Sequence, residues 1–205
     1  AVYSATYSNF RMPFTVKARD GKTDLHGLLF RPTNLDPSKK YPIINYAYPG
    51  PQSGSVGTRS FAAARVDHQA LAELGFIVFT LDGMGTPGRS KSFHDVCYGN
   101  MADNTLEDQI SGMRQLAQKF PYLDLTRVGV WGHSGGGFAT AAAMFRFPEF
   151  YKVGISESGN HDKLGPYIQH ARDRGIEVLA PELNSSERDF AVVPEGIRFG
   201  FSGVK

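Results

Sequence analysis

One serine in this 205-residue sequence stands between glycines in a pattern that could carry covalent chemistry. Gly132-His133-Ser134-Gly135-Gly136 fits G-x-S-x-G, in which a strand turns sharply into a helix and exposes the serine hydroxyl. Such a turn forces the serine into a strained backbone conformation, so the positions two residues away on either side must lack side chains. Both are glycine here. We therefore predict that Ser134 is the nucleophile of an acyl-transfer reaction.

The segments that flank Ser134 are of the types that this turn requires. An apolar strand pattern, "RVGVWGH", precedes it, and a run rich in small residues, "GGFATAAAMFRF", follows as a helix. The beginning of a helix is a place where the helix dipole favours developing negative charge. The context therefore favours a catalytic serine over a glycine-rich turn whose serine has no catalytic role.

A second glycine pattern is weaker evidence for a functional site. Residues 83–88, "GMGTPG", follow the apolar strand "FIVFTLD" and match G-x-G-x-x-G, the pattern of dinucleotide-binding folds. The residues after it, "RSKSFHDVCYGN", are polar and have no apolar helical face, which that fold requires. Cys97 is the single cysteine and has no partners at a metal-ligand spacing. We therefore assign no cofactor-binding residue and no metal ligand.

Strands and helices alternate along the first 160 residues, which predicts an α/β fold with a mostly parallel sheet. An antiparallel hairpin is expected over residues 14–32, with its turn at Asp20-Gly21. Asp67 is expected to cap one helix that Gly75 ends, and Asn104 or Thr105 to cap another. The remaining expected elements are strands at 41–48, 76–82, 127–133 and 151–158, and helices at 67–75, 104–120 and 136–147.

Composition and charge exclude several classes of protein. A hydrophobic content of 41% and a charged content of 20% are typical of a soluble globular chain. A formal net charge of +2 is too small to indicate a nucleic-acid or membrane partner. No apolar run approaches the roughly 20 residues that span a bilayer. The first residues show no signal-peptide pattern, and the compartment stays open.

Residues 14–162 resemble the catalytic domain of the prolyl oligopeptidase family of serine peptidases, and among these the bacterial dipeptidyl-peptidase IV-like enzymes. The matching stretches include "LDGMGTPGRSKSFHD", "NTLEDQISGMRQLAQKFPYLDLTRVGVWGHSGGGFAT" and "VGISESGNHD", in family order. The resemblance implies an α/β-hydrolase fold, a peptide substrate cleaved after proline or alanine, and Ser134 as nucleophile. It also implies that the hydroxyl of Tyr48, in "AYPGP", forms half of an oxyanion hole, with the backbone N–H of Gly135 as the other half.

The acid and the histidine of a catalytic triad do not match. In this fold both follow the serine, and the histidine removes the hydroxyl proton. His161 and His170 are the histidines after Ser134, and neither lies in the family's catalytic histidine motif. We therefore expect an incomplete α/β-hydrolase sandwich whose peptidase activity is impaired.

Residues 163–205 resemble a segment of the bacterial DNA polymerase III alpha subunit. The match rests on the run 174–179, on Asn184, Ser186 and Phe190, and on the run 196–200. We therefore expect residues 1–162 to form a partial peptidase domain, and 163–205 a tail of different origin that could dock as an extra helix and strand. A natural fusion, a mis-assembled gene, a constructed chimera and a divergent hydrolase with a coincidental tail all remain open.

Three functional hypotheses follow: a serine peptidase fragment, a non-catalytic binding or DNA-associated module, and a partly stable chain without a selected function. Acidic and basic residues balance in the tail, which argues against autonomous nucleic-acid binding. The sheet is expected to stop after its sixth strand. Its edge would then be capped by "IEVLAP" of the tail or left open, and an open edge would favour self-association.

Overall fold

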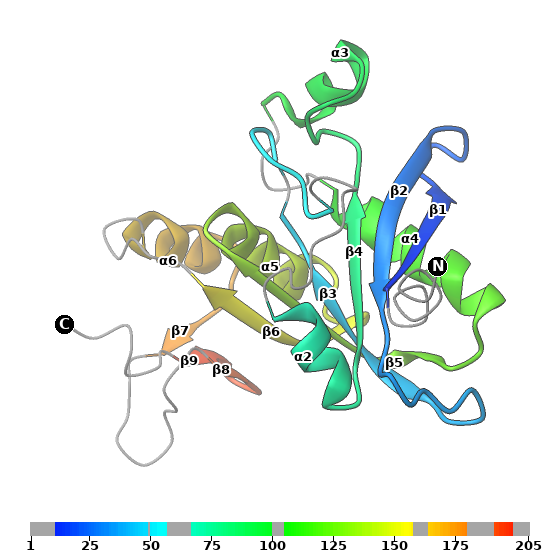
Figure 1. Ribbon diagram of the computed structural model, residues 1–205. Coiled ribbons are helices and arrows are strands. Elements are labelled where there is room, and N and C mark those ends of the chain that lie inside the picture. The colour runs from blue at the N-terminus through cyan, green and yellow to red at the C-terminus, as the bar shows by residue number, and fades with distance from the viewer. Residues whose placement is uncertain are drawn as a thin grey trace.

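The computed structural model describes residues 11–48, 50–56, 67–99, 105–157, 164–179 and 191–198. Six strands among these residues form one sheet of order β1-β2-β4-β3-β5-β6 (Figure 1). Strand β3 runs parallel to β4 and β5, and β5 runs parallel to β6, whereas β1 and β2 are antiparallel. The strands are β1 (Arg11–Lys17), β2 (Asp24–Phe30), β3 (Tyr41–Tyr46), β4 (Ile77–Asp82), β5 (Leu123–His133) and β6 (Tyr151–Glu157). The predicted α/β fold, mostly parallel with an antiparallel hairpin, is confirmed.

The two faces of the sheet carry separate apolar cores, because successive side chains of a strand point to opposite faces. Strand β4 illustrates this, since Phe79 belongs to the core that includes helices α4 (Leu106–Lys119) and α5 (Gly135–Arg146). Val78 belongs to the core on helix α2 (His68–Glu73). With both faces covered, residues Ile77–Leu81 are all buried, which is why this strand reads as a continuous apolar run.

The hairpin between β1 and β2 has the turn that the sequence predicts. The Asp20 carboxylate accepts hydrogen bonds from the N–H groups of Lys22 and Thr23 at 2.8 and 2.9 Å, and from the Thr23 hydroxyl at 2.6 Å. These bonds, that of the Thr23 hydroxyl above all, lower the pKa of Asp20 to about 2. Gly21 adopts a φ of 70°, which an L side chain rarely takes.

The helices begin where the sequence predicts, but their caps differ. Asp67 and Thr105 occupy the N-cap positions of α2 and α4, and neither side chain makes a capping hydrogen bond. Asp67 has φ −91° and ψ 18°, and Thr105 has a left-handed φ of 66°, so neither is in the extended conformation that capping needs. Asn104, the alternative cap, lies outside the described residues.

A network of buried polar side chains joins four elements of the fold. The Asn45 amide of β3 donates to Gln109 Oε1 of α4 at 3.0 Å, and Gln109 Nε2 donates to the Leu81 carbonyl at 2.9 Å. The Tyr151 hydroxyl of β6 donates to Asn45 Oδ1 at 3.0 Å. Burial raises the pKa of the Tyr151 hydroxyl, so it remains a donor. The network fixes β3 relative to α4 and β6.

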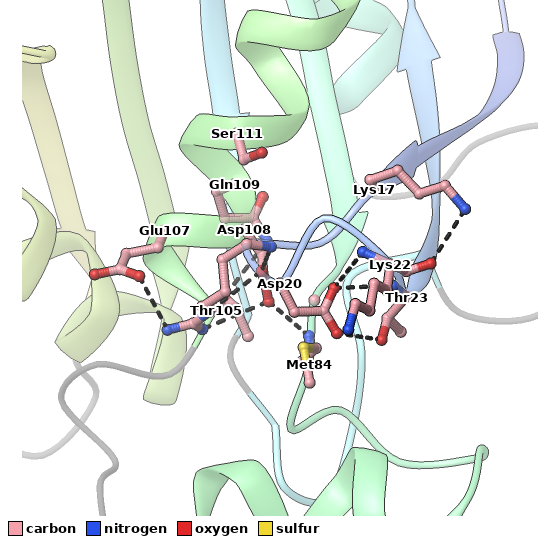
Figure 2. Close-up of polar contacts among 12 residues, drawn as sticks. Lys17, Asp20, Lys22, Thr23, Met84, Thr105, Glu107, Asp108, Gln109 and Ser111 are labelled. Carbon is pink, nitrogen blue, oxygen red and sulfur yellow. Dashed lines mark hydrogen bonds and ion pairs between the residues drawn. The ribbon is translucent and has the colours of Figure 1, made fainter.

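Asp108, fully buried on the first turn of α4, ties the hairpin turn to the loop after β4 (Figure 2). Its Oδ1 accepts the Arg19 backbone N–H at 2.8 Å and the Arg19 Nε at 3.2 Å. Its Oδ2 accepts the Met84 N–H at 2.9 Å, and Glu107 lies 3.6 Å from the same guanidinium. A buried carboxylate is tolerated here because charged and backbone donors surround it.

The segment after β6 forms a helix and a small separate sheet. Helix α6 spans Leu164–Asp173, and strands β7 (Val178–Leu179), β9 (Gly196–Arg198) and β8 (Ala191–Val193) form a sheet in that order. The expected strand in "IEVLAP" therefore exists as β7, but it pairs with β9 and does not cap the edge strand β6. Val153 and Ile155 on β6 are 61% and 55% exposed. None of the helices in the described ranges could cross a membrane.

The buried amide network yields a test of stability. Tyr151→Phe removes the hydrogen bond to Asn45 Oδ1 and leaves a buried acceptor unsatisfied, so we expect the free energy of unfolding to fall by about 1–3 kcal/mol in urea titrations. Tyr122 provides the matched control, because its buried hydroxyl has no hydrogen-bond partner among the described residues. Tyr122→Phe should leave stability unchanged or raise it. Equal losses in both variants would refute a role for the network.

Candidate active site

Ser134 occupies the sharp turn that the glycine pattern predicts. It follows β5 directly, precedes the first residue of α5, and has φ 57° and ψ −116°. Among the described residues only Thr105 is a further non-glycine with a positive φ. A non-glycine residue in this region is strained, and it persists because the surroundings over-determine it. The backbone thus holds an exposed serine at the end of the sheet.

Glycines are required on both sides of Ser134 because the chain passes very close to the end of β3. A Cβ atom at Gly132 would lie 2.5 Å from the Ala47 carbonyl oxygen, and one at Gly136 would lie 2.4 Å from the same atom. Real Cβ atoms do not approach oxygen so closely, so no side chain fits at either position. The spacing that singled out Ser134 in the sequence therefore has its physical cause in the packing against Ala47.

Two backbone hydrogen bonds hold Ser134 in place. The Ser134 N–H donates to the Glu157 carbonyl of β6 at 2.7 Å, and the Ser134 carbonyl accepts from Phe138 N–H at 3.1 Å. The N–H of Gly135, at the beginning of α5, finds no acceptor in the described part of the chain. This geometry leaves the Gly135 N–H available for an oxygen bound beside Ser134.

Tyr48 lies against Gly135. A Cβ atom on Gly135 would be 3.7 Å from the Tyr48 hydroxyl oxygen and 3.6 Å from its Cζ atom. The Tyr48 side chain is partly buried, and its hydroxyl accepts a hydrogen bond from Gln52 Nε2 at 2.7 Å. Burial and the neighbouring Tyr48 and Glu157 raise the pKa of Tyr46, two residues earlier on β3. The structure thus brings together Ser134, Gly135 and Tyr48.

No histidine whose side chain is described hydrogen-bonds to the Ser134 hydroxyl. His133 Nδ1 lies 3.6 Å from a Glu157 carboxylate oxygen, and His94 Nε2 lies 2.9 Å from the Pro51 carbonyl oxygen. His68 is buried among the rings of Phe30, Tyr46 and Trp131, and His26 contacts Thr15. His161 and the side chain of His170 lie outside the described residues.

The second glycine pattern, residues 83–88, forms a loop that leads into the four-residue helix α3 (Lys91–His94) and the 3₁₀ helix η1 (Asp95–Cys97). A helix this short offers no extended amphipathic face of the kind that a dinucleotide-binding fold requires. Cys97 is buried, and its thiol donates to the His94 carbonyl at 3.1 Å.

Comparisons with known proteins identify the family. The model of the prolyl oligopeptidase family matches residues 62–189. The chain belongs to the prolyl oligopeptidase family. Human dipeptidyl peptidase 8 is 32% identical over 143 residues, which cover 70% of this chain and 16% of that protein. A "Probable dipeptidyl-aminopeptidase B" of Ajellomyces capsulatus is 40% identical over 112 residues, which cover 54% of this chain and 12% of that protein.

A solved structure supports the same assignment to the prolyl oligopeptidase family. The crystal structure of a "putative dipeptidyl aminopeptidase IV" from Bacteroides ovatus matches with a TM-score of 0.66 and 39% identity. The match covers 71% of this chain and 20% of that one. The chain therefore spans between 12% and 20% of the length of these relatives. The family match continues to residue 189, beyond the junction predicted near Asp162, and the polymerase resemblance of the tail stays a prediction.

Sequence reasoning missed the two groups that hold the candidate site most directly. The Glu157 carbonyl, which accepts from the Ser134 N–H, is a backbone group, so the residue type at position 157 does not predict this contact. Gln52 follows Tyr48 in a turn-rich stretch, where a glutamine gives no local signal. The proximity of Gln52 to Tyr48 in sequence is the one feature that could have suggested the contact.

The close approach of Ala47 to the turn can be tested by adding a methyl group. Gly136→Ala would drive a Cβ atom into the Ala47 carbonyl, so we expect the free energy of unfolding to fall by about 1–3 kcal/mol or more. Gly129→Ala on β5 is the control, because its Cβ would meet nothing nearer than 3.5 Å. That variant should stay within about 1 kcal/mol of the parent. Similar urea midpoints for both would contradict the tight turn.

Proposed function

We propose that this chain is the nucleophile-bearing part of a serine peptidase that cleaves peptides after proline or alanine near the amino terminus. The observation that carries the proposal is the strained backbone of Ser134, with φ 57° and ψ −116°, which presents its hydroxyl at the beginning of α5. Membership of the prolyl oligopeptidase family and the names of the dipeptidyl peptidase relatives support the substrate class. Peptides are accordingly the proposed partners.

In the proposed reaction the Ser134 oxygen attacks the carbonyl carbon of the scissile bond, and the carbonyl oxygen takes the negative charge. The Gly135 N–H and the Tyr48 hydroxyl donate to this oxyanion, and the dipole of α5 adds to the stabilisation. Collapse of the intermediate breaks the C–N bond, the departing amine takes up a proton equivalent to the one that Ser134 lost, and an ester is left on Ser134. A water molecule then hydrolyses the ester by the same route.

We further propose that these 205 residues alone perform this chemistry slowly. A general base contributes typically about 10²–10⁴-fold in rate, and no histidine side chain in the described ranges hydrogen-bonds to the Ser134 hydroxyl. Oxyanion stabilisation and binding persist without the base, so a residual Ser134-dependent rate remains.

Chemical rescue with imidazole tests this proposal. Imidazole in solution can take the Ser134 proton, so we expect it to accelerate hydrolysis of an alanyl-proline nitrophenyl ester, with a rate that rises with imidazole concentration. Ser134→Ala is the control, because imidazole also attacks the ester directly and that background is the same in both proteins. The difference in slope between the two proteins measures acylation at Ser134.

Two results would contradict the proposal in different ways. Equal slopes in the parent and in Ser134→Ala would show that Ser134 is not a nucleophile. Fast Ser134-dependent hydrolysis without imidazole would show that His161 or His170 supplies the base, and replacing each by asparagine would identify which one.

The tail supports a second, weaker proposal. If residues 163–205 derive from a polymerase, the chain would be a chimera and could act as a DNA-associated or other binding module. Salt-dependent binding to duplex DNA would support it, and the mixture of acidic and basic residues in the tail argues against it. Exposed Val153 and Ile155 on the edge strand β6 make self-association a further proposal.

A further inference from the structure

Gln52 contacts Tyr48 but has no part in the reaction proposed for Ser134. Its side-chain Nε2 donates a hydrogen bond of 2.7 Å to the hydroxyl oxygen of Tyr48, although both residues lie on the same exposed loop after β3. The Tyr48 hydroxyl in turn lies beside Gly135. The Tyr48 hydroxyl therefore accepts from the Gln52 amide and lies near Gly135, the residue that follows Ser134.

The loop that carries Gln52 is held at several points. The Tyr48 N–H donates to Ser55 Oγ at 2.8 Å, and the Val56 N–H donates to Asp82 Oδ1 at 3.0 Å. His94 Nε2 lies 2.9 Å from the Pro51 carbonyl oxygen. Anchors on both sides of Gln52 restrict its backbone, so its side chain reaches the phenol at a small further cost in conformational entropy.

The direction of this hydrogen bond decides what the phenol can do. A tyrosine hydroxyl has a single hydrogen and can also accept, whereas the amide nitrogen of glutamine only donates. Once Gln52 Nε2 occupies a lone pair of the Tyr48 oxygen, the hydroxyl hydrogen is free to point elsewhere. A phenol that accepts one hydrogen bond is also polarised to donate a stronger one.

We propose that Gln52 is a positioning residue, which donates to the Tyr48 hydroxyl oxygen and thereby directs the hydroxyl hydrogen toward an oxyanion formed at Ser134. This inference rests on the proposed function of Ser134 and Tyr48, and it adds the group that orients the donor. The inference also requires a hydrogen-bond donor at position 52. A donor there leaves the Tyr48 hydrogen for the oxyanion, whereas an acceptor there would bind that hydrogen itself.

Binding of alanyl-proline boronic acid to the full chain tests the proposal without requiring turnover. The Ser134 oxygen forms a bond to boron, the hydroxyl proton leaves to solvent, and the resulting four-coordinate boronate is an anion like the tetrahedral intermediate. Its dissociation constant is measured by boron NMR, in which the four-coordinate adduct has its own signal. The Ser134→Ala protein gives the background.

We expect Gln52→Ala to weaken boronate binding by about three- to tenfold, the worth of one hydrogen bond. Gln52→Glu should weaken it further, because the carboxylate accepts the Tyr48 hydrogen. Gln118→Glu, an equal charge change at an exposed position of α4, is the control and should leave binding unchanged. In a Tyr48→Phe background, Gln52→Ala should have no further effect.

The outcomes separate this inference from the function on which it rests. No Ser134-dependent adduct in the parent would overturn the proposed function together with the role of Gln52. An adduct that Gln52→Ala leaves equally tight would overturn the role of Gln52 alone, and so would tighter binding, which would mean that the amide oxygen faces the phenol. The same loss in the Tyr48→Phe background would show that Gln52 does not act through Tyr48.

Discussion

The carbonyl oxygen of Ala47 lies where the end of β3, the end of β5 and the first turn of α5 meet. Cβ atoms at Gly132 and Gly136 would lie within 2.5 Å of it, and the Ala47 N–H donates to the Trp131 carbonyl at 3.0 Å. This contact leaves no room for a relaxed connection between β5 and α5. The positive φ of Ser134, the exposure of its hydroxyl and the position of Tyr48 all depend on it.

The buried amide network beneath this contact explains how β3 can serve as a fixed reference. Asn45 on β3 contacts Gln109 of α4 and Tyr151 of β6, and all three side chains are almost fully buried. Polar groups in such surroundings are costly unless every partner is present, so the network admits a narrow range of arrangements. Tyr48 lies two residues beyond the end of β3, so the fixed position of Asn45 also restricts where Tyr48 can lie.

The fold and the central serine could be predicted because their signals are local. Alternating strands and helices, the Asp20-Gly21 turn and the glycines around Ser134 each impose requirements within a few residues. The amide network could not be predicted, since Asn45 is 64 residues from Gln109 and 106 from Tyr151. Asp67 makes no capping hydrogen bond because its backbone, at φ −91° and ψ 18°, is not in the extended conformation that capping needs, and residue type alone does not determine that conformation.

The hydrogen bond from the Ser134 N–H to the Glu157 carbonyl places Ser134 beside the last strand of the main sheet. Among the described strands β6 pairs on one side only, with β5, while its Glu157 carbonyl holds the serine backbone from that side. Ser156 Oγ of the same strand donates to the Gly137 carbonyl of α5 at 2.8 Å, so β6 contacts the turn on both sides of Ser134. A polypeptide paired along the free edge of β6 would therefore also restrict the motion of the Ser134 backbone.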